Sequence, residues 1–175
     1  MKEVATRSRF TTYSHNLGST FGFTFITMML LWLRGHIVRG NINIRVDNGV
    51  EFCMGSERKE GEWNTRFELL EARLNPIPAG AKHLQAIIEN SHRKDDESFL
   101  SIQPRRCKDS YEFINKAQRW QDTWNTVCPS FGIGMRGKTP LEKLRGYKTL
   151  IHPHIYSFPV LLMKDVIKLF GPAIG

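Results

Sequence analysis

The spacing of apolar and polar residues along the chain predicts an alternation of strands and helices. Residues 9–15 are rich in aromatic and β-branched side chains, and residues 42–46 alternate strictly between apolar and polar, so both segments are expected to be strands. Apolar positions at helical spacing, such as Phe67, Leu70 and Leu74, predict helices instead. The predicted helices span residues 20–39, 61–74, 82–100 and 111–124.

The remaining segments are less regular. Residues 128–140 hold two prolines and three glycines and are expected to be irregular. Residues 141–144 form at most a short helical turn, and residues 156–163 are interpreted as a strand. The order strand, helix, strand, helix, followed by further helices, indicates an α/β layer fold. A length of 175 residues is typical of one domain.

Composition narrows the class of protein. Apolar residues make up 41% and charged residues 24%, as in ordinary globular proteins, which excludes a disordered or fibrous chain. The longest apolar run, Phe21–Leu33, is shorter than the ~20 residues that cross a bilayer, so no membrane-spanning segment is expected. Cys53, Cys107 and Cys128 lack the spacing of a zinc site, so no zinc is expected, and reduced thiols favour a cytoplasmic protein.

The charge is basic overall and unevenly distributed. The formal net charge is +8, with +5 over residues 1–46, −4 over residues 47–100 and +7 over residues 101–175. A basic balance favours an anionic partner, either a nucleic acid or an anionic membrane surface, and charge alone does not choose between them. An acidic centre between basic flanks suits a metal site in a DNA-binding protein, but it also arises by chance on solvated surfaces.

The first candidate for chemistry is Asp47, at the end of the strand predicted over residues 42–46. Open α/β sheets place their sites at the carboxyl ends of strands. However, Asp47-Asn48-Gly49 is also a common tight-turn sequence, because Asn and Gly tolerate positive φ. Turn formation and catalysis both remain open for this residue.

The second candidate is Glu89, which lies among apolar residues of the helix predicted over residues 82–100. A carboxylate at the edge of an apolar face needs a partner or a metal. Arg93, four residues later, would supply an ordinary ion pair. Together with His92 and Lys94, Arg93 also forms a basic patch that suits either phosphate contacts or a solvated surface.

A series of short motifs, taken in order, resembles one known family. The motifs are Ala5-Thr6-Arg7-Ser8-Arg9-Phe10, Asp47-Asn48-Gly49-Val50-Glu51-Phe52, Ile77-Pro78-Ala79-Gly80-Ala81-Lys82-His83-Leu84-Gln85-Ala86, Ile88-Glu89-Asn90-Ser91-His92-Arg93-Lys94-Asp95-Asp96-Glu97-Ser98-Phe99, Trp124-Asn125 and Gly137-Lys138-Thr139-Pro140-Leu141-Glu142-Lys143-Leu144. Each motif is weak alone, whereas the ordered series is specific. It is similar to the catalytic core of retroviral-type integrases and insertion-sequence transposases. The resemblance predicts an integrase-core-like domain over residues 1–150 and a C-terminal extension over residues 151–175.

The resemblance implies an RNase H-like fold, which is a mixed sheet flanked by helices. It also implies DNA integration or transposition, in which three carboxylates hold two Mg²⁺ or Mn²⁺ ions for phosphoryl transfer on DNA ends. Asp47 matches the second Asp of this site, and Glu89, 42 residues further on, matches its Glu. The DNA-binding positions that the resemblance implies are Lys82, His92, Arg93 and Lys94.

One part of the family pattern is expected to be missing. The first strand and its Asp lie upstream of the segment that residues 5–10 match, and Glu3 matches an acidic position that is not a metal ligand. With Asp47 and Glu89 alone, Mg²⁺ or Mn²⁺ is expected to bind weakly. Loss of the first strand would also expose the edge of its neighbour to pairing with another chain.

Three functional alternatives follow. The chain is expected to be an integrase-core fragment that is active if completed, or a catalytically inactive remnant that binds DNA or oligomerises. Its expected partners are DNA and either a second copy of itself or an intact transposase. An unrelated RNA-binding or membrane-surface protein is the third alternative. Tyr156, Phe158 and Phe170 are expected in the core or in subunit contacts rather than in a ligand site.

Overall fold

The computed structural model describes the chain apart from residues 17, 47–56, 78–85, 148 and 171–175. The described residues form two compact units, each of which is presented by itself. The first unit comprises residues 1–11 and 86–161, and the second comprises residues 12–85 and 162–175. The segment 151–175, predicted as a single extension, is therefore divided between the two units.

The fold class is α/β with helices dominating, which confirms the prediction in its coarse form. In the described part of the chain the sheet has two strands, and they are parallel. The larger mixed sheet of an RNase H-like fold stays a prediction. Among the helices that the structure describes, none is long and apolar enough to cross a membrane.

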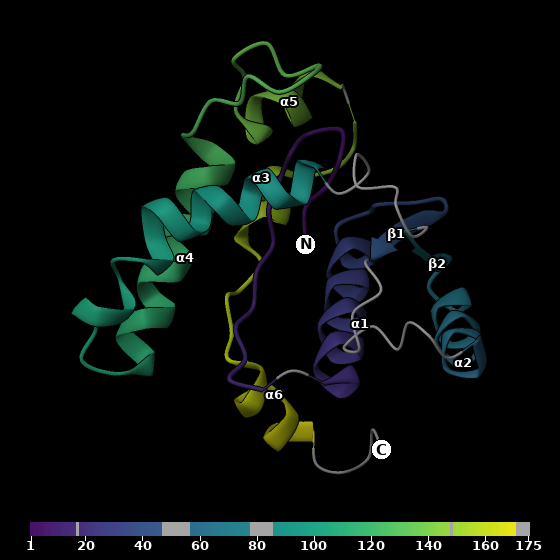
Figure 1. The fold of residues 1–175 in the computed structure, drawn as a ribbon. Helices are drawn as coiled ribbons and strands as arrows, with labels where there is room; N and C mark the ends of the chain where they lie inside the picture. The colour runs from purple at the N-terminus through teal and green to yellow at the C-terminus, as the bar shows by residue number, and fades with distance from the viewer. Residues whose placement is uncertain (17, 47–56, 78–85, 148, 171–175) are drawn as a thin grey trace. The chain divides into compact units, whose positions relative to one another are not determined.

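The second unit is built on a β-α-β element. Its helices and strands are α1 (Ser19–Gly35), β1 (Ile42–Val46), α2 (Glu57–Glu68), β2 (Ala72–Pro76) and α6 (Met163–Phe170). In the sheet, Ile42 lies opposite Ala72 and Val46 lies opposite Pro76, and α2 connects the two strands (Figure 1). Parallel neighbours need such a crossover, because the chain must return to the end at which the first strand began. The strand predicted over 42–46 is confirmed, and the helix predicted over 20–39 is confirmed as far as Gly35, where α1 ends.

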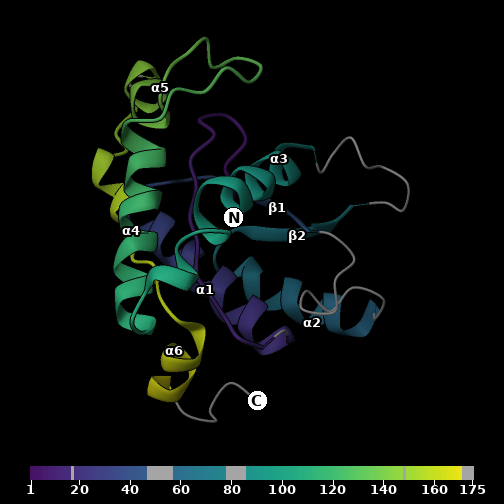
Figure 2. The same ribbon diagram turned by 60° about the vertical axis from the view of Figure 1, so that its left-hand side comes forward.

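One face of this sheet carries the core of the second unit. Alternation along the strands directs Ile44 and Val46 of β1, and Ala72 and Leu74 of β2, to the same side. Both α1 and α2 cover that side, as Figure 2 shows. The apolar residues that they contribute are Ile26, Leu30, Trp63 and Phe67. Polar residues alternate with the buried ones and face outward, so the sheet separates an apolar interior from a polar surface.

The helix predicted to continue through Leu74 ends earlier, at Glu68. Glu71 has a φ of 48°, a left-handed conformation that an α-helix cannot continue. Beyond it, the Leu74 amide donates a hydrogen bond to Asn64 Oδ1 at 2.7 Å, and the chain pairs with β1. Phe67 and Leu74 both reach the core, one from a helix and one from a strand. The helical spacing of the apolar residues therefore predicted correctly that both side chains are buried. It was wrong to place Leu74 in a helix, because Leu74 lies in strand β2.

The first unit is mostly helical. Its elements are α3 (Ala86–Asp95), the π-helical turn η3 (Asp96–Leu100), the 3₁₀ turn η4 (Pro104–Arg106), α4 (Ser110–Thr126), α5 (Pro140–Gly146) and the 3₁₀ turn η5 (Pro153–Ser157). They confirm the helix predicted over 111–124 and, from Ala86 onward, the helix predicted over 82–100. α5 begins with a capping box, in which Thr139 and Glu142 exchange side chain to backbone hydrogen bonds of 2.8 and 3.1 Å.

Neither of the two strands predicted outside the β-α-β element is formed. Residues 9–15 take part only in isolated bridges, through Arg9 and Tyr13. Residues 156–163 include the end of η5 and the start of α6. Aromatic and β-branched content favoured extended backbone at both places, but no sheet is present beside them in the described residues.

Amide side chains of α4 take the place of a strand partner in the first unit. Asn125 Oδ1 accepts a hydrogen bond from the Arg9 amide and Asn125 Nδ2 donates to the Arg9 carbonyl, both at 2.8 Å. Gln121 accepts from the Thr11 amide at 2.7 Å and donates to the Phe158 carbonyl at 2.8 Å. Two extended segments are thereby fixed to one helix, because buried backbone groups need partners.

Tyr156 and Phe158 belong to the interior of the first unit, as expected. The ring centroid of Phe10 lies 6.4 Å from that of Tyr156 and 5.9 Å from that of Phe158. The Tyr156 hydroxyl donates to the Pro140 carbonyl at 3.1 Å, and burial raises the pKa of this phenol. Phe170 lies outside the side chains that the structure describes.

Candidate nucleic-acid interface

α3 carries most of the residues to which the sequence analysis assigned a function. Ser91 and Asp95 of α3, and Phe99 of η3, are buried and lie four residues apart, so they form one inner face. Glu89 and residues 92–94 are exposed. The helix thus presents its predicted functional residues to solvent, and a partly polar stripe attaches it to the unit.

Asp95 anchors this inner face. Its carboxylate forms an ion pair with Arg9, whose side chain is 3% exposed, and accepts a hydrogen bond from Trp120 Nε1 at 3.0 Å. Because both charges are removed from water, each offsets part of the desolvation penalty of the other. The sequence analysis missed this pair, since Asp95 stands in an acidic run. Its distance of four residues from Ser91 and from Phe99 was the signal that could have found it.

Glu89 lies in the first turn of α3 with an exposed side chain. The ordinary ion pair with Arg93 is not formed, because the Arg93 guanidinium donates to Glu97 at 3.3 Å and to Asn90 at 2.9 Å. Within the described residues the Glu89 carboxylate has no hydrogen-bond or ion-pair partner. Of the two apolar neighbours expected to be buried, Ile88 is half-buried and Ile87 lies outside the described side chains. An exposed carboxylate is stable in water without a partner, so Glu89 is available to a ligand.

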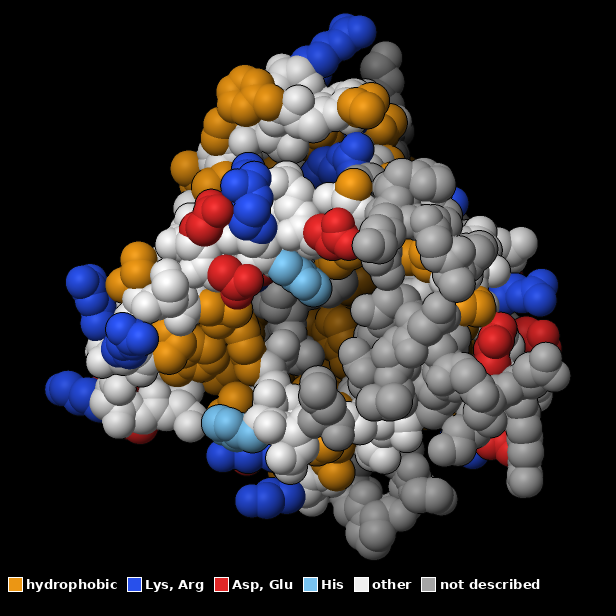
Figure 3. All heavy atoms as spheres, in the orientation of Figure 1, with side chains coloured by type: hydrophobic (Ala, Val, Ile, Leu, Met, Phe, Trp, Pro, Cys, Tyr) orange, Lys and Arg blue, Asp and Glu red, His pale blue; other side chains and the backbone are white. Residues whose placement is uncertain are grey.

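The outward surface of α3 is mixed in charge. Figure 3 shows acidic, basic and histidine side chains side by side over this helix. The exposed residues that contribute are Glu89, His92, Arg93, Lys94, Asp96 and Glu97. The predicted basic patch is therefore not uniformly positive, and a phosphate that approaches α3 meets carboxylates as well as cations.

Lys94 differs from its neighbours because it lies over an aromatic ring of α4. Its Nζ is 5.5 Å from the Trp124 ring centroid, Lys2 Nζ is 4.5 Å from it, and the Arg9 guanidinium carbon is 5.4 Å from it. Cation–π attraction to the shared ring acts against the mutual repulsion of these groups. Burial, followed by the neighbouring cations Arg7, Lys94 and Arg9, lowers the pKa of Lys2 to about 8.

Two predicted site residues, Asp47 and Lys82, lie outside the described residues. β1 ends at Val46, so Asp47 is the next residue along the chain, as predicted. In the ranges that the structure does describe, no group of three or more His, Cys, Asp or Glu side chains could hold a metal ion. This part of the chain supplies one carboxylate, Glu89, toward the expected metal site.

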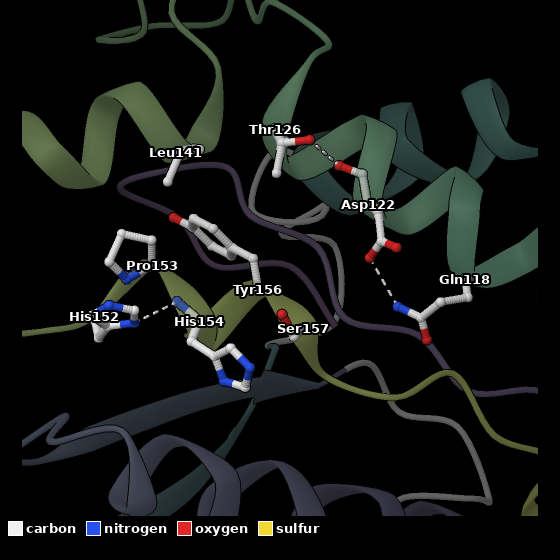
Figure 4. A pocket seen from close by; sticks show the side chains of 9 residues that line it. All are labelled: Gln118, Asp122, Thr126, Leu141, His152, Pro153, His154, Tyr156 and Ser157. Carbon is white, nitrogen blue, oxygen red and sulfur yellow. Dashed lines mark hydrogen bonds between the residues drawn. The ribbon is translucent and has the colours of Figure 1, made fainter.

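The first unit also contains a hollow that the sequence analysis did not predict. It has a volume of about 540 Å³, lies between α4, α5 and η5, and is shown in Figure 4. Its lining residues are Gln118, Asp122, Thr126, Leu141, His152, Pro153, His154, Tyr156 and Ser157. Some of its polar groups are used within its own wall: Gln118 donates to Asp122 at 2.9 Å, and the His154 amide donates to His152 Nδ1 at 3.1 Å. No predicted site residue lines it.

No family model matches the chain, and no curated protein or solved structure matches it significantly. A functional assignment therefore rests on the residues of this chain. Two features bear on it most directly: the exposed carboxylate of Glu89 on α3, for which the described part of the chain offers no partner, and the cations that gather around Trp124.

Proposed function

We propose that this protein binds DNA and is an integrase-core transposase fragment that carries two of the three carboxylates of the site. The observation that carries the proposal is the exposed carboxylate of Glu89, which has no partner among the described residues and lies in the first turn of a helix with a basic end. That helix, α3, follows the β1-α2-β2 element, whose first strand ends directly before Asp47. The order of elements and acidic positions, together with the sequence motifs, supports the assignment.

In this proposal Asp47 and Glu89 hold a divalent metal ion, Mg²⁺ or Mn²⁺. When bound, such an ion activates a water or a 3′-hydroxyl and stabilises the leaving oxygen of a phosphodiester. Carboxylate oxygens are the ligands that these hard cations prefer. Glu89 suits the role because no ion pair in the described residues competes for it. Lys94 and Arg93 bind the flanking phosphates of the DNA.

The second candidate is DNA binding without catalysis. It requires only positive charge, which the net charge of +8 and the cations around Trp124 supply. Removing one member of a catalytic unit commonly removes most of the rate. The protein would then act by occupying DNA or by pairing with an intact transposase.

DNA binding is tested by titrating the whole chain with a short duplex over a series of salt concentrations. We expect the affinity to fall steeply as salt rises, because the release of counterions from DNA dominates such binding. A flat salt dependence contradicts the proposal. So does a preference for RNA or for anionic vesicles over the duplex.

Metal-dependent strand cleavage separates the two candidates. If the chain is catalytic, Asp47→Asn and Glu89→Gln should abolish nicking in Mg²⁺ or Mn²⁺ while duplex binding persists. Asp96→Asn, which removes another exposed carboxylate close to α3, is the matched control and should retain nicking. Duplex binding with no nicking by the unmodified chain assigns the non-catalytic role.

A further inference from the structure

Positive charge gathers around the Trp124 ring in the first unit. The Lys2 and Lys94 ammonium groups lie 4.5 and 5.5 Å from the ring centroid, and the Arg9 guanidinium carbon lies 5.4 Å from it. These four residues, named here the Trp124 cluster, come from the N-terminal segment, α3 and α4. The fold rather than the local sequence therefore assembles the cluster.

The carboxylates near the cluster are already engaged. Asp95 is paired with Arg9 and also accepts a hydrogen bond from an indole N–H. The Glu3 carboxylate accepts hydrogen bonds from the backbone amides of Ala5 and Thr6, at 2.7 and 2.6 Å. In the described part of the chain, neither Lys2 nor Lys94 has a carboxylate within ion-pair distance. The cluster thus carries positive charge that the protein itself does not neutralise.

Arg7 adds a further cation whose hydrogen-bonding capacity is largely unused. In the ranges that the structure describes, its Nε is buried without a hydrogen-bond partner, and its Nη2 makes a long hydrogen bond, of 3.4 Å, to the Ile133 carbonyl. The Arg7 carbonyl accepts a hydrogen bond from Trp124 Nε1 at 3.2 Å, which ties this residue to the cluster. Burial and repulsion from Arg7, Lys94 and Arg9 lower the pKa of Lys2 to about 8. An anion at this place would reduce an existing electrostatic cost.

We propose that the Trp124 cluster is a phosphate-binding site, in which the Lys2 and Lys94 ammonium groups hold one phosphate of a nucleic-acid backbone. Ammonium donors form strong charge-assisted hydrogen bonds with phosphate oxygens, and contact with the shared ring restrains both side chains. Arg9 stays paired with Asp95 next to the same ring. That the phosphate belongs to a nucleic acid rests on the proposed function. That the cluster binds an anion rests only on the contacts of Lys2, Lys94 and Arg9 with the Trp124 ring.

The test compares the full chain with Lys2→Gln and Lys94→Gln. Lys108→Gln is the matched control, because it removes the same charge from an exposed lysine elsewhere in the first unit. Two ligands are titrated separately, inorganic phosphate and a short DNA duplex. Binding is followed by tryptophan fluorescence for the first and by fluorescence anisotropy for the second, with any affinity tag at the C-terminal end.

Each of the two cluster variants should weaken phosphate binding about three- to tenfold and lower the salt slope for the duplex by ~0.9. Lys108→Gln should leave phosphate binding unchanged. Phosphate affinity of the unmodified chain should also fall as the pH rises through about 8, because Lys2 loses its proton there, and this fall should be absent in Lys2→Gln. Lys2→Arg keeps the positive charge and should therefore retain phosphate binding. This result would show that the weaker binding of Lys2→Gln comes from loss of charge and not from misfolding.

The two ligands separate failure of this site from failure of the proposed function. If Lys2→Gln and Lys94→Gln bind phosphate as tightly as the unmodified chain, the site is refuted, even if the duplex binds. If phosphate binding depends on both lysines but the duplex does not bind, the anion site stands and the DNA-binding function is refuted. If the binding of both ligands depends on Lys2 and Lys94, and not on Lys108, the anion site and its assignment to a nucleic-acid phosphate are both supported.

Discussion

The interiors of the two units differ in chemistry. Among the described residues of the second unit, Thr24 is the only buried side chain that is polar, and aliphatic and aromatic groups fill the rest. The described residues of the first unit include eight buried polar or charged ones, which are Thr6, Ser8, Arg9, Ser91, Asp95, Gln121, Asn125 and Thr139. The two interiors also satisfy buried backbone groups in different ways.

The difference follows from how extended backbone finds its hydrogen-bond partners. In the second unit, β1 and β2 bond to each other, so the side chains beneath them are free to be apolar. In the first unit, residues 9–11 pair with other backbone only at an isolated bridge between Arg9 and Lys2, and residues 158–160 belong to no strand that the structure describes. Gln121 and Asn125 of α4 bond to them instead. A helix that replaces a strand partner has to bury amides, and the polar interior is the consequence.

The largest expected effect tests the apolar interior through Phe67→Ala. Phe67 is 1% exposed, and its ring centroid lies 5.2 Å from that of Phe23 and 6.1 Å from that of Trp63. We expect unfolding free energy to fall by about 4 kcal/mol, since the change removes buried area and leaves a cavity. Urea unfolding measures it. Leu69→Ala, at a side chain that is 87% exposed, should stay within about 0.5 kcal/mol of the unmodified chain. Similar small losses for both variants would show that this core does not stabilise the fold.

The charge pair of the polar interior is tested by Asp95→Asn. The variant keeps an oxygen for Trp120 Nε1 but leaves the buried Arg9 guanidinium without a counter-charge. We expect a loss of about 3 kcal/mol in unfolding free energy, because a buried charge without its partner is strongly unfavourable. The neighbouring exposed Asp96 provides the control, as Asp96→Asn should be nearly neutral. Equal stability of the two variants would mean that the first unit does not depend on its buried ions.

The hydrogen bonds from the amide side chains of α4 to the extended backbone are tested by Asn125→Leu. This change replaces a buried polar side chain of the first unit with an apolar one, as in the interior of the second unit. It removes both hydrogen bonds to Arg9, so a buried amide and a buried carbonyl lose their partners. We expect a net loss of about 2 kcal/mol despite the gain in apolar area, since unsatisfied buried groups bear their full desolvation penalty. Asn115→Leu, on the exposed side of the same helix, is the control measured in parallel. A neutral or stabilising Asn125→Leu would remove the distinction between the two interiors.

This contrast also explains which parts of the fold could be predicted from the sequence. Strict alternation predicted β1 over residues 42–46, and spaced apolar positions predicted α4, because burial of one apolar face leaves a visible period. A long, mostly apolar segment predicted α1. Strands predicted from composition alone, over 9–15 and 156–163, were wrong. Their partners are the side chains of Gln121 and Asn125, and such long-range pairing leaves no local period in the sequence.

The candidate site was predictable to a similar extent. Glu89 is exposed next to basic residues, and the alternative pair with Arg93 was wrong, whereas its role as a metal ligand stays a prediction. Asp47 follows β1 as predicted but lies outside the described residues. The charges around Trp124 could not be anticipated, because Lys2 and Lys94 are brought together only by tertiary packing.

The smallest expected effect on stability comes from the titration of Lys2, a half-buried cation of the first unit. Its pKa is lowered from 10.5 to about 8, so the folded state binds this proton less tightly than the unfolded chain does. The charged form therefore reduces stability below about pH 8, and this penalty disappears as the pH rises toward 10.5. We expect the stability of the unmodified chain, relative to Lys2→Gln, to increase across that interval in urea unfolding at a series of pH values. High salt should reduce the increase by screening the repulsion from Lys94 and Arg7. A difference between the two proteins that does not change with pH would show that Lys2 is solvated like an ordinary surface lysine, and the first unit would then tolerate its charge without an anion.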